Sequence, residues 1–169
     1  YYLVISFIGL IIGINLAKLT KDELKVGKKY FDTLELVVIL VILALSLQLL
    51  INLDNIFLNL INILLIISGF LLFYYKFDKI YFYLGLLLLS ILQISQDLFI
   101  LFSSLIFIFG LPYGTKLYSL GSRHWLKDLF YFVIPFSLFF FISLSNLTSY
   151  KIIFFTCGAF LAFILKRKL

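Results

Sequence analysis

The stretch IYFYLGLLLLSILQISQDLFILFSSLIFIFGLP, residues 80–112, sets how many times the chain is expected to cross a membrane. A transmembrane helix needs about 20 apolar residues, so this stretch is too long for one ordinary span. Its apolar run is interrupted by Gln93, Ser95, Gln96 and Asp97. We therefore predict two helices, over residues 80–94 and 98–112, joined by a polar turn. Both are short, which leaves open two spans in a thinned bilayer or a re-entrant hairpin.

The composition places most of the chain in lipid. Hydrophobic residues make up 64% of the chain and charged residues 13%, with a mean hydropathy of +1.18. Soluble domains carry about 25% charged residues, so this chain has too few charges to cover a surface that faces water. Its two most polar segments, 18–33 and 113–128, are too short to build a soluble core. We expect a single transmembrane domain over residues 1–169.

The remaining apolar segments complete the predicted fold, and they cover residues 1–17, 34–53, 56–75, 129–147 and 152–165. Segment 1–17 lacks a basic start and a cleavage site, so we expect a retained helix rather than a signal peptide. Thr20 and Glu23 fit a capping box, which predicts a short helix from about Lys21 to Val26 that stops at Gly27. The fold class is an all-α integral membrane protein, a bundle of about seven transmembrane helices.

After the first helix, the chain can be divided into three helical hairpins, over residues 34–75, 80–112 and 129–165. The pair Asp54-Asn55 separates the helices of the first hairpin, because it ends one helix and caps the next. The hairpins begin with KKYFDTLEL, KFDKIYFYL and HWLKDLFYF, which each combine cations, aromatic residues and one Asp. This likeness fits an internal repeat, although anchoring of inner helix ends by the same residue types explains it more simply.

The cations give the predicted spans a direction. With seven spans, 13 of the 14 Lys and Arg residues fall on one side, and Lys151 alone falls on the other. The cation-rich side holds Lys18, Lys21, Lys25, Lys28, Lys29, Lys76, Lys79, Lys116, Arg123, Lys127, Lys166, Arg167 and Lys168. The positive-inside rule makes this side cytoplasmic, with the N-terminus outside the cell membrane and the C-terminus in the cytoplasm. A single span over 80–112 would largely abolish this asymmetry. The glycosylation triplet at Asn146 falls outside.

The segment 110–128 holds the most informative polar residues. Arg123, His124 and Lys127 can together grip a lipid headgroup phosphate. Asp128 can orient His124 as a general base, so these two are the candidate catalytic residues. The simpler interpretation is an interfacial loop whose cations and Trp125 sit at headgroup depth.

A second candidate site lies at the predicted outer turn of residues 80–112. Gln93, Gln96 and Asp97 are candidates for a polar pocket that faces outward, although helix capping explains Asp97 equally well. The chain has one His and one Cys, the latter within an apolar run, so we predict no metal site and no cofactor. Glu35, one turn into its span, can pair with Lys28 or Lys29.

Two segments carry a resemblance. KDELKVGKKYFDTLELVVIL (21–40), with its E-L-x-x-G-K-K-Y-F pattern, and GLPYGT (110–115) resemble segments of small uncharacterised archaeal multi-spanning membrane proteins. The resemblance implies an archaeal cytoplasmic membrane, and it brings no activity and no functional residues with it.

These observations favour a non-enzymatic membrane protein, either a small transporter-like bundle or an accessory subunit of a membrane complex. The alternative is a lipid-acting enzyme, or a lipid-headgroup-binding protein, that uses segment 110–128. The expected partners are membrane lipid and other membrane subunits or a second copy of the chain. Because the cations sit at helix ends, where membrane proteins place them in any case, we do not expect nucleic acid binding.

The sidedness can be tested with single cysteines placed beside Lys28 and in the triplet at Asn146. We expect an impermeant maleimide applied to intact cells to label the Asn146 position and to spare the Lys28 position. Labelling of both positions from the same side would rule out the seven-span arrangement.

Overall fold

The computed structural model describes residues 2–20, 24–51, 60–119, 124–139 and 146–168. Within these ranges the chain forms α-helices and no strand, which confirms the all-α fold class. The helices are α1 (Tyr2–Leu19), α2 (Leu24–Ile51), α3 (Leu60–Tyr75), α4 (Ile80–Leu92), α5 (Gln96–Ser119), α6 (His124–Phe139) and α7 (Asn146–Lys168). The predicted turn at Asp54-Asn55 lies outside the described residues.

Among the described helices, four are long and apolar enough to cross a membrane, within Tyr2–Leu19, Gly27–Ile51, Gln96–Tyr118 and Ser149–Arg167. Only 33% of the α1 span is buried in the protein, so most of its apolar surface faces outward. α3 and α4 are apolar but have 16 and 13 residues. At 1.5 Å per residue they reach about 24 and 20 Å, against a hydrocarbon core of about 30 Å. Four possible crossings are therefore the part of the seven-span prediction that is confirmed.

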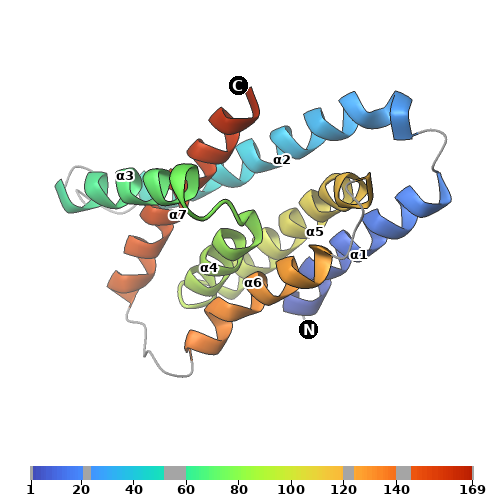
Figure 1. The fold of residues 1–169 in the computed structure, drawn as a ribbon. Helices are drawn as coiled ribbons and strands as arrows, with labels where there is room; N and C mark the ends of the chain where they lie inside the picture. The colour runs from blue at the N-terminus through green and yellow to red at the C-terminus, as the bar shows by residue number, and fades with distance from the viewer. Residues whose placement is uncertain (1, 21–23, 52–59, 120–123, 140–145, 169) are drawn as a thin grey trace.

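The closest helix contacts join segments that are far apart in the sequence. α1 packs along α5, α3 packs along α7 and α4 packs along α6, while α2 lies against both α5 and α7 (Figure 1). Among consecutive helices, α4 and α5 contact each other less extensively than any of these pairs. The division into three hairpins therefore does not identify the main packing partners.

Glycines bring the backbones of α1 and α5 together. Each helix has two glycines four residues apart, Gly9 and Gly13 in α1 and Gly110 and Gly114 in α5. A Cβ atom added at Gly110 would lie 2.5 Å from the backbone nitrogen of Leu10, closer than van der Waals contact allows. Such spaced small residues are typical of membrane helices that pack closely. α3 and α7 also approach closely through one glycine each, since Gly69 faces the carbonyl oxygen of Phe155 and Gly158 faces that of Ile66.

α4 is the central helix of the bundle. Its contacts are with α5, α6 and α7, and it lies between them in Figure 1. Ten of its 13 residues are buried, among them Tyr81 and Tyr83. The turn predicted between residues 94 and 98 is present, since α4 ends at Leu92 and α5 begins at Gln96. α4 can be shorter than an ordinary span because other helices, rather than lipid, surround most of it.

The predicted polar loop over residues 113–128 is wrong. α5 continues through Pro112 to Ser119, and α6 begins at His124. Proline removes one backbone hydrogen bond, which membrane helices tolerate when neighbouring groups compensate. The missing bond is the one to the carbonyl of Ile108, four residues earlier, while the Pro112 carbonyl accepts from the hydroxyl of Thr115 at 2.7 Å. The adjacent glycines face α1, so close packing stabilises this part of α5 as a helix.

The predicted polar segment over residues 18–33 is also mostly helical. α2 runs without interruption from Leu24 through Gly27, so the predicted helix end at Gly27 is wrong. A glycine costs about 1 kcal/mol in a helix interior, which the packing of α2 on α5 and α7 outweighs. α7 likewise begins at Asn146, earlier than the predicted span of 152–165, and extends to Lys168.

Replacing Gly158 with alanine tests the backbone contact between α3 and α7. We expect Gly158→Ala to lower the free energy of unfolding in detergent by about 1–3 kcal/mol, the usual cost of overpacking. Gly27→Ala is the matched control, because the nearest atom to its added Cβ is a Phe31 side-chain carbon at 3.0 Å, which can move. We expect this variant to be neutral or to gain up to about 1 kcal/mol. Equal effects of the two substitutions would contradict the role of the contact.

Candidate functional site

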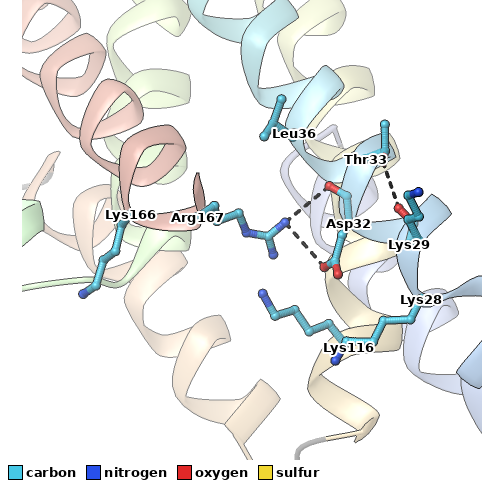
Figure 2. Close-up of a pocket in the computed structure, with 8 residues that line it drawn as sticks. All are labelled: Lys28, Lys29, Asp32, Thr33, Leu36, Lys116, Lys166 and Arg167. Carbon is cyan, nitrogen blue, oxygen red and sulfur yellow. Dashed lines mark hydrogen bonds and ion pairs between the residues drawn. The ribbon is translucent and has the colours of Figure 1, made fainter. Parts of the chain in front are cut away.

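Five cationic side chains line one cavity of about 780 Å³ at one end of the bundle (Figure 2). The cations are Lys28 and Lys29 from the start of α2, Lys116 from the last turn of α5, and Lys166 and Arg167 from the end of α7. Asp32 is the one carboxylate among the lining residues. The cavity is therefore strongly basic, and its volume falls within the range of about 300–1,000 Å³ that small-molecule sites occupy.

The N-terminal part of α2 carries charged side chains that face α5 and α7. Lys28, Asp32 and Glu35 follow one another at helical spacing, so they share one face of α2. This helix packs against α5 and α7. Both of those helices end here with basic residues, which the negative end of a helix dipole favours. Three helix termini thus bring their charges to one place.

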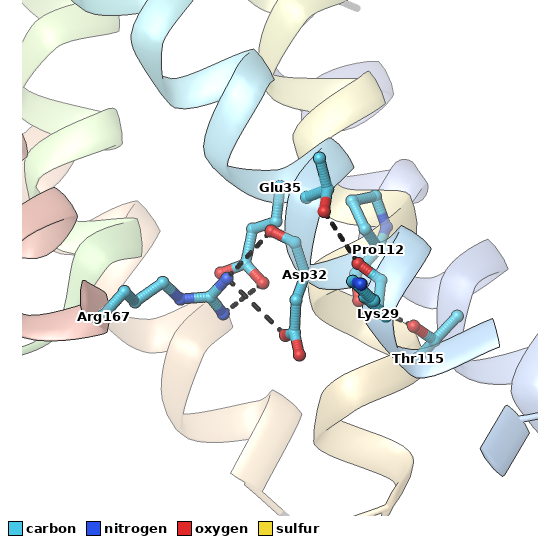
Figure 3. A network of polar contacts seen from close by, with 7 residues as sticks. Lys29, Asp32, Glu35, Pro112, Thr115 and Arg167 are labelled. Carbon is cyan, nitrogen blue, oxygen red and sulfur yellow. Dashed lines mark hydrogen bonds and ion pairs between the residues drawn. The ribbon is translucent and has the colours of Figure 1, made fainter. Parts of the chain in front are cut away.

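Arg167, which lines the cavity, forms an ion pair with the buried Glu35 of α2 (Figure 3). The guanidinium group of Arg167 donates through Nη2 to Oε2 of Glu35, and through Nη1 to the backbone oxygen of Asp32 at 3.5 Å. Its Nη1 also lies 3.7 Å from Oδ1 of Asp32, and its Cζ lies 5.1 Å from the ring centroid of Phe163. The side chain of Glu35 is 1% exposed and that of Arg167 is 14% exposed.

Glu35 was expected to pair with Lys28 or Lys29, and the structure corrects this expectation. Its partner is Arg167, which follows it in the sequence by more than one hundred and thirty residues. The expectation failed because it considered only cations near Glu35 on the same segment. Oε1 of Glu35, the second carboxylate oxygen, is buried and has no hydrogen-bond partner in the structure.

A smaller cavity of about 190 Å³ shares Lys116, Lys166 and Arg167 with the basic cavity. Asp78, in the turn between α3 and α4, lies on its wall and forms exposed ion pairs with Lys79 at 3.5 Å and Lys166 at 3.4 Å. Partial burial alone would raise the pKa of Asp78, but the two ammonium groups outweigh this effect and hold the pKa below its ordinary value. Asp78 therefore stays ionised and places a negative charge beside Lys166.

Of the site residues predicted in segment 110–128, Lys127 and Asp128 are described, and neither lines the basic cavity or the smaller cavity beside it. Arg123 lies outside the described residues, and His124 opens α6 with a side chain that is likewise outside them. Lys127 is exposed, and Asp128 is buried with 5% exposure and has interactions of its own. The predicted headgroup site at Arg123, His124 and Lys127 therefore stays a prediction, separate from the basic cavity.

The predicted polar pocket lies at the opposite end of α5 from Lys116. Gln93 is half-buried in the turn after α4, and Gln96 and Asp97 are exposed at the start of α5. None of the three lines a cavity described here.

Most serine and threonine hydroxyls within the described spans bond to their own helix. Ser46, Ser90 and Thr156, for example, donate to carbonyl oxygens three or four residues earlier. Such bonds satisfy the hydroxyl without forming a polar path between helices. A cavity of about 330 Å³ between α1 and α6 is lined wholly by apolar side chains, as expected of a surface that contacts lipid chains. Within the described part of the chain, no three His, Cys, Asp or Glu side chains gather to hold a metal ion.

Comparison with protein-family models, with curated proteins and with solved structures finds no match to this chain. The functional argument therefore depends on the cavity and its charges.

Removal of Arg167 tests the buried ion pair. We expect Arg167→Gln to lower the free energy of unfolding in detergent by about 3 kcal/mol, because the charge of Glu35 would stay buried without its partner. The double variant Arg167→Gln/Glu35→Gln should recover most of this loss. The neighbouring Lys166→Gln is the control, and we expect a far smaller effect because its pair with Asp78 is exposed. A loss of equal size in Lys166→Gln would contradict the assignment.

Proposed function

We propose that this chain is a polytopic membrane protein that binds a phosphate-bearing anion, in particular a lipid headgroup, in the basic cavity. The observation that carries the proposal is the convergence of five cations on one cavity. Phosphate oxygens accept hydrogen bonds from lysine and arginine. Several such donors around one cavity allow a single phosphate group to accept from two or more of them at once. This proposal takes up the headgroup-binding prediction and moves it to other residues.

Membrane anchoring and helix dipoles explain why basic residues occur at helix ends. They do not explain why the cations of three helix ends line one cavity. A lysine or arginine that only anchors its helix would interact more favourably with a lipid headgroup of its own, away from the other cations. Like charges also repel when they are brought together. An anion in the cavity would offset that repulsion, so we infer that the cavity is built to hold one.

We also propose the finer topology, with seven spans, the N-terminus outside and the cavity facing the cytoplasm. Cations that the positive-inside asymmetry assigns to the cytoplasm, from α2, α5 and α7, gather at one end of the bundle, which supports this orientation. The cell membrane, and an archaeal one by resemblance, is the proposed location. Anionic lipid in the inner leaflet would then have direct access to the cavity.

The transporter-like and accessory-subunit predictions are both compatible with a bound lipid, and the enzyme alternative is less supported. A lipid-acting enzyme was expected to use His124 and Asp128, and the His124 side chain lies outside the described residues. Because five cations that can bind an anion line the cavity, we place ligand recognition there.

The double variant Lys28→Gln/Lys29→Gln tests the proposal. Both side chains are exposed and line the cavity, and neither takes part in the hydrogen bonds between Arg167 and Glu35. Each surface lysine contributes about 1 kcal/mol to the binding of anionic lipid, so we expect roughly thirtyfold weaker binding. Native mass spectrometry of the purified protein with added phosphatidic acid, phosphatidylcholine or inorganic phosphate would measure it. Retention of phosphatidic acid alone indicates a lipid, and retention of phosphate as well indicates a free anion site.

Two control variants locate the site. Lys127→Gln removes an exposed cation of the segment first predicted to bind the headgroup, and Lys151→Gln removes the cation assigned to the outer side. We expect both to bind phosphatidic acid as the unmodified protein does. If Lys127→Gln has the larger effect, the segment at the start of α6 is the site and the cavity is not.

A further inference from the structure

Arg167 belongs to two sites at once. Its guanidinium group lines the basic cavity, and the same group neutralises the buried carboxylate of Glu35. Figure 3 shows Arg167 reaching across from α7 to Asp32 and Glu35 on α2. The guanidinium group has five N–H donors and Glu35 accepts from Nη2, so a ligand that draws this group into the cavity competes with Glu35.

The surroundings of Glu35 offer few other partners. The titratable and charged groups that face it are Asp32 on its own helix, Arg167 on α7, Lys116 and Tyr113 on α5, and Tyr81 on α4. Among the described residues, the cations that act on it most strongly are Arg167 and Lys116, and both line the cavity. The groups that compensate Glu35 are thus the groups that an anion would attract.

We propose that anion binding in the basic cavity is coupled to the uptake of one proton by Glu35. A buried carboxylate that loses its counter-charges costs several kcal/mol, and protonation removes that charge. Oε1 of Glu35, which is buried without a hydrogen-bond partner, is the atom that accepts the proton. The proton comes from hydronium or from a buffer acid in the solvent: its bond to that donor breaks, the O–H bond to Oε1 forms, and water or the buffer's conjugate base is left.

The coupling has a thermodynamic consequence. If the anion favours the protonated form of Glu35, a proton must favour the bound anion by the same factor. Affinity for the anion therefore falls as the pH rises above neutrality, by up to tenfold per pH unit when one proton is taken up. The inference rests on the proposed anion site and adds that the site senses the proton concentration.

Calorimetry with a short-chain phosphatidylglycerol tests the coupling, because the phosphodiester itself does not titrate between pH 5 and 8. Titrations of the detergent-solubilised protein in two buffers of different ionisation enthalpy give the number of protons taken up. We expect close to one proton per lipid at pH 7 for the unmodified protein. Glu35→Gln should take up none and should bind at least tenfold more tightly at pH 8, because Arg167 is free for the ligand.

Asp97→Asn is the matched control, since it removes an exposed carboxylate at the other end of α5. It should keep both the affinity and the proton uptake of the unmodified protein. Binding without proton uptake by the unmodified protein overturns the coupling and leaves the anion site intact, whether or not Glu35→Gln folds. Proton uptake that persists in Glu35→Gln assigns it to another group and also overturns the inference. Absence of saturable binding in every variant overturns the anion site itself.

Discussion

Backbone contact between helices that are distant in the sequence determines how this bundle is assembled. In a bilayer, apolar side chains gain little by leaving lipid for protein, so helices associate where their surfaces fit closely. Gly9 and Gly13 allow α1 to approach α5, and Gly69 and Gly158 allow α3 to approach α7. Larger residues at these positions would separate the helices and remove the dispersion contacts that hold them together. The glycine pairs are therefore the contacts on which the remaining packing depends.

The basic cavity is a consequence of this assembly. Because α7 packs along α3 and crosses α2, its last turn places Arg167 beside the first turns of α2. The Glu35–Arg167 pair that results is costly, since both groups leave water, and buried ion pairs rarely stabilise a protein by themselves. The pair lies next to four lysines, and we propose that an anion attracted by them competes with Glu35 for Arg167. This competition is the physical basis of the proposed proton coupling.

Several elements followed from the sequence because their cause is local. The polar residues 93–97 had to interrupt an apolar run, and the structure has a turn there between α4 and α5. The predicted ends at Gly27 and Pro112 were wrong because local helix-ending preferences of about 1–3 kcal/mol were outweighed by tertiary packing. At Pro112, the close contacts of the neighbouring Gly110 and Gly114 with α1 favour continuation of the helix. The loop expected over residues 113–128 is absent over 113–119 and 124–128 for the same reason.

The sequence by itself determined the environment of the protein, the all-α class and the concentration of cations at the ends of certain helices. These features depend on composition and on the position of charges relative to apolar runs, which can be read along a single chain. Only the tertiary structure decided that α1 pairs with α5, that α3 pairs with α7 and that Glu35 faces Arg167. Helix pairing depends on the complementary shapes of two surfaces, and no local pattern near Glu35 records which distant helix end will meet it.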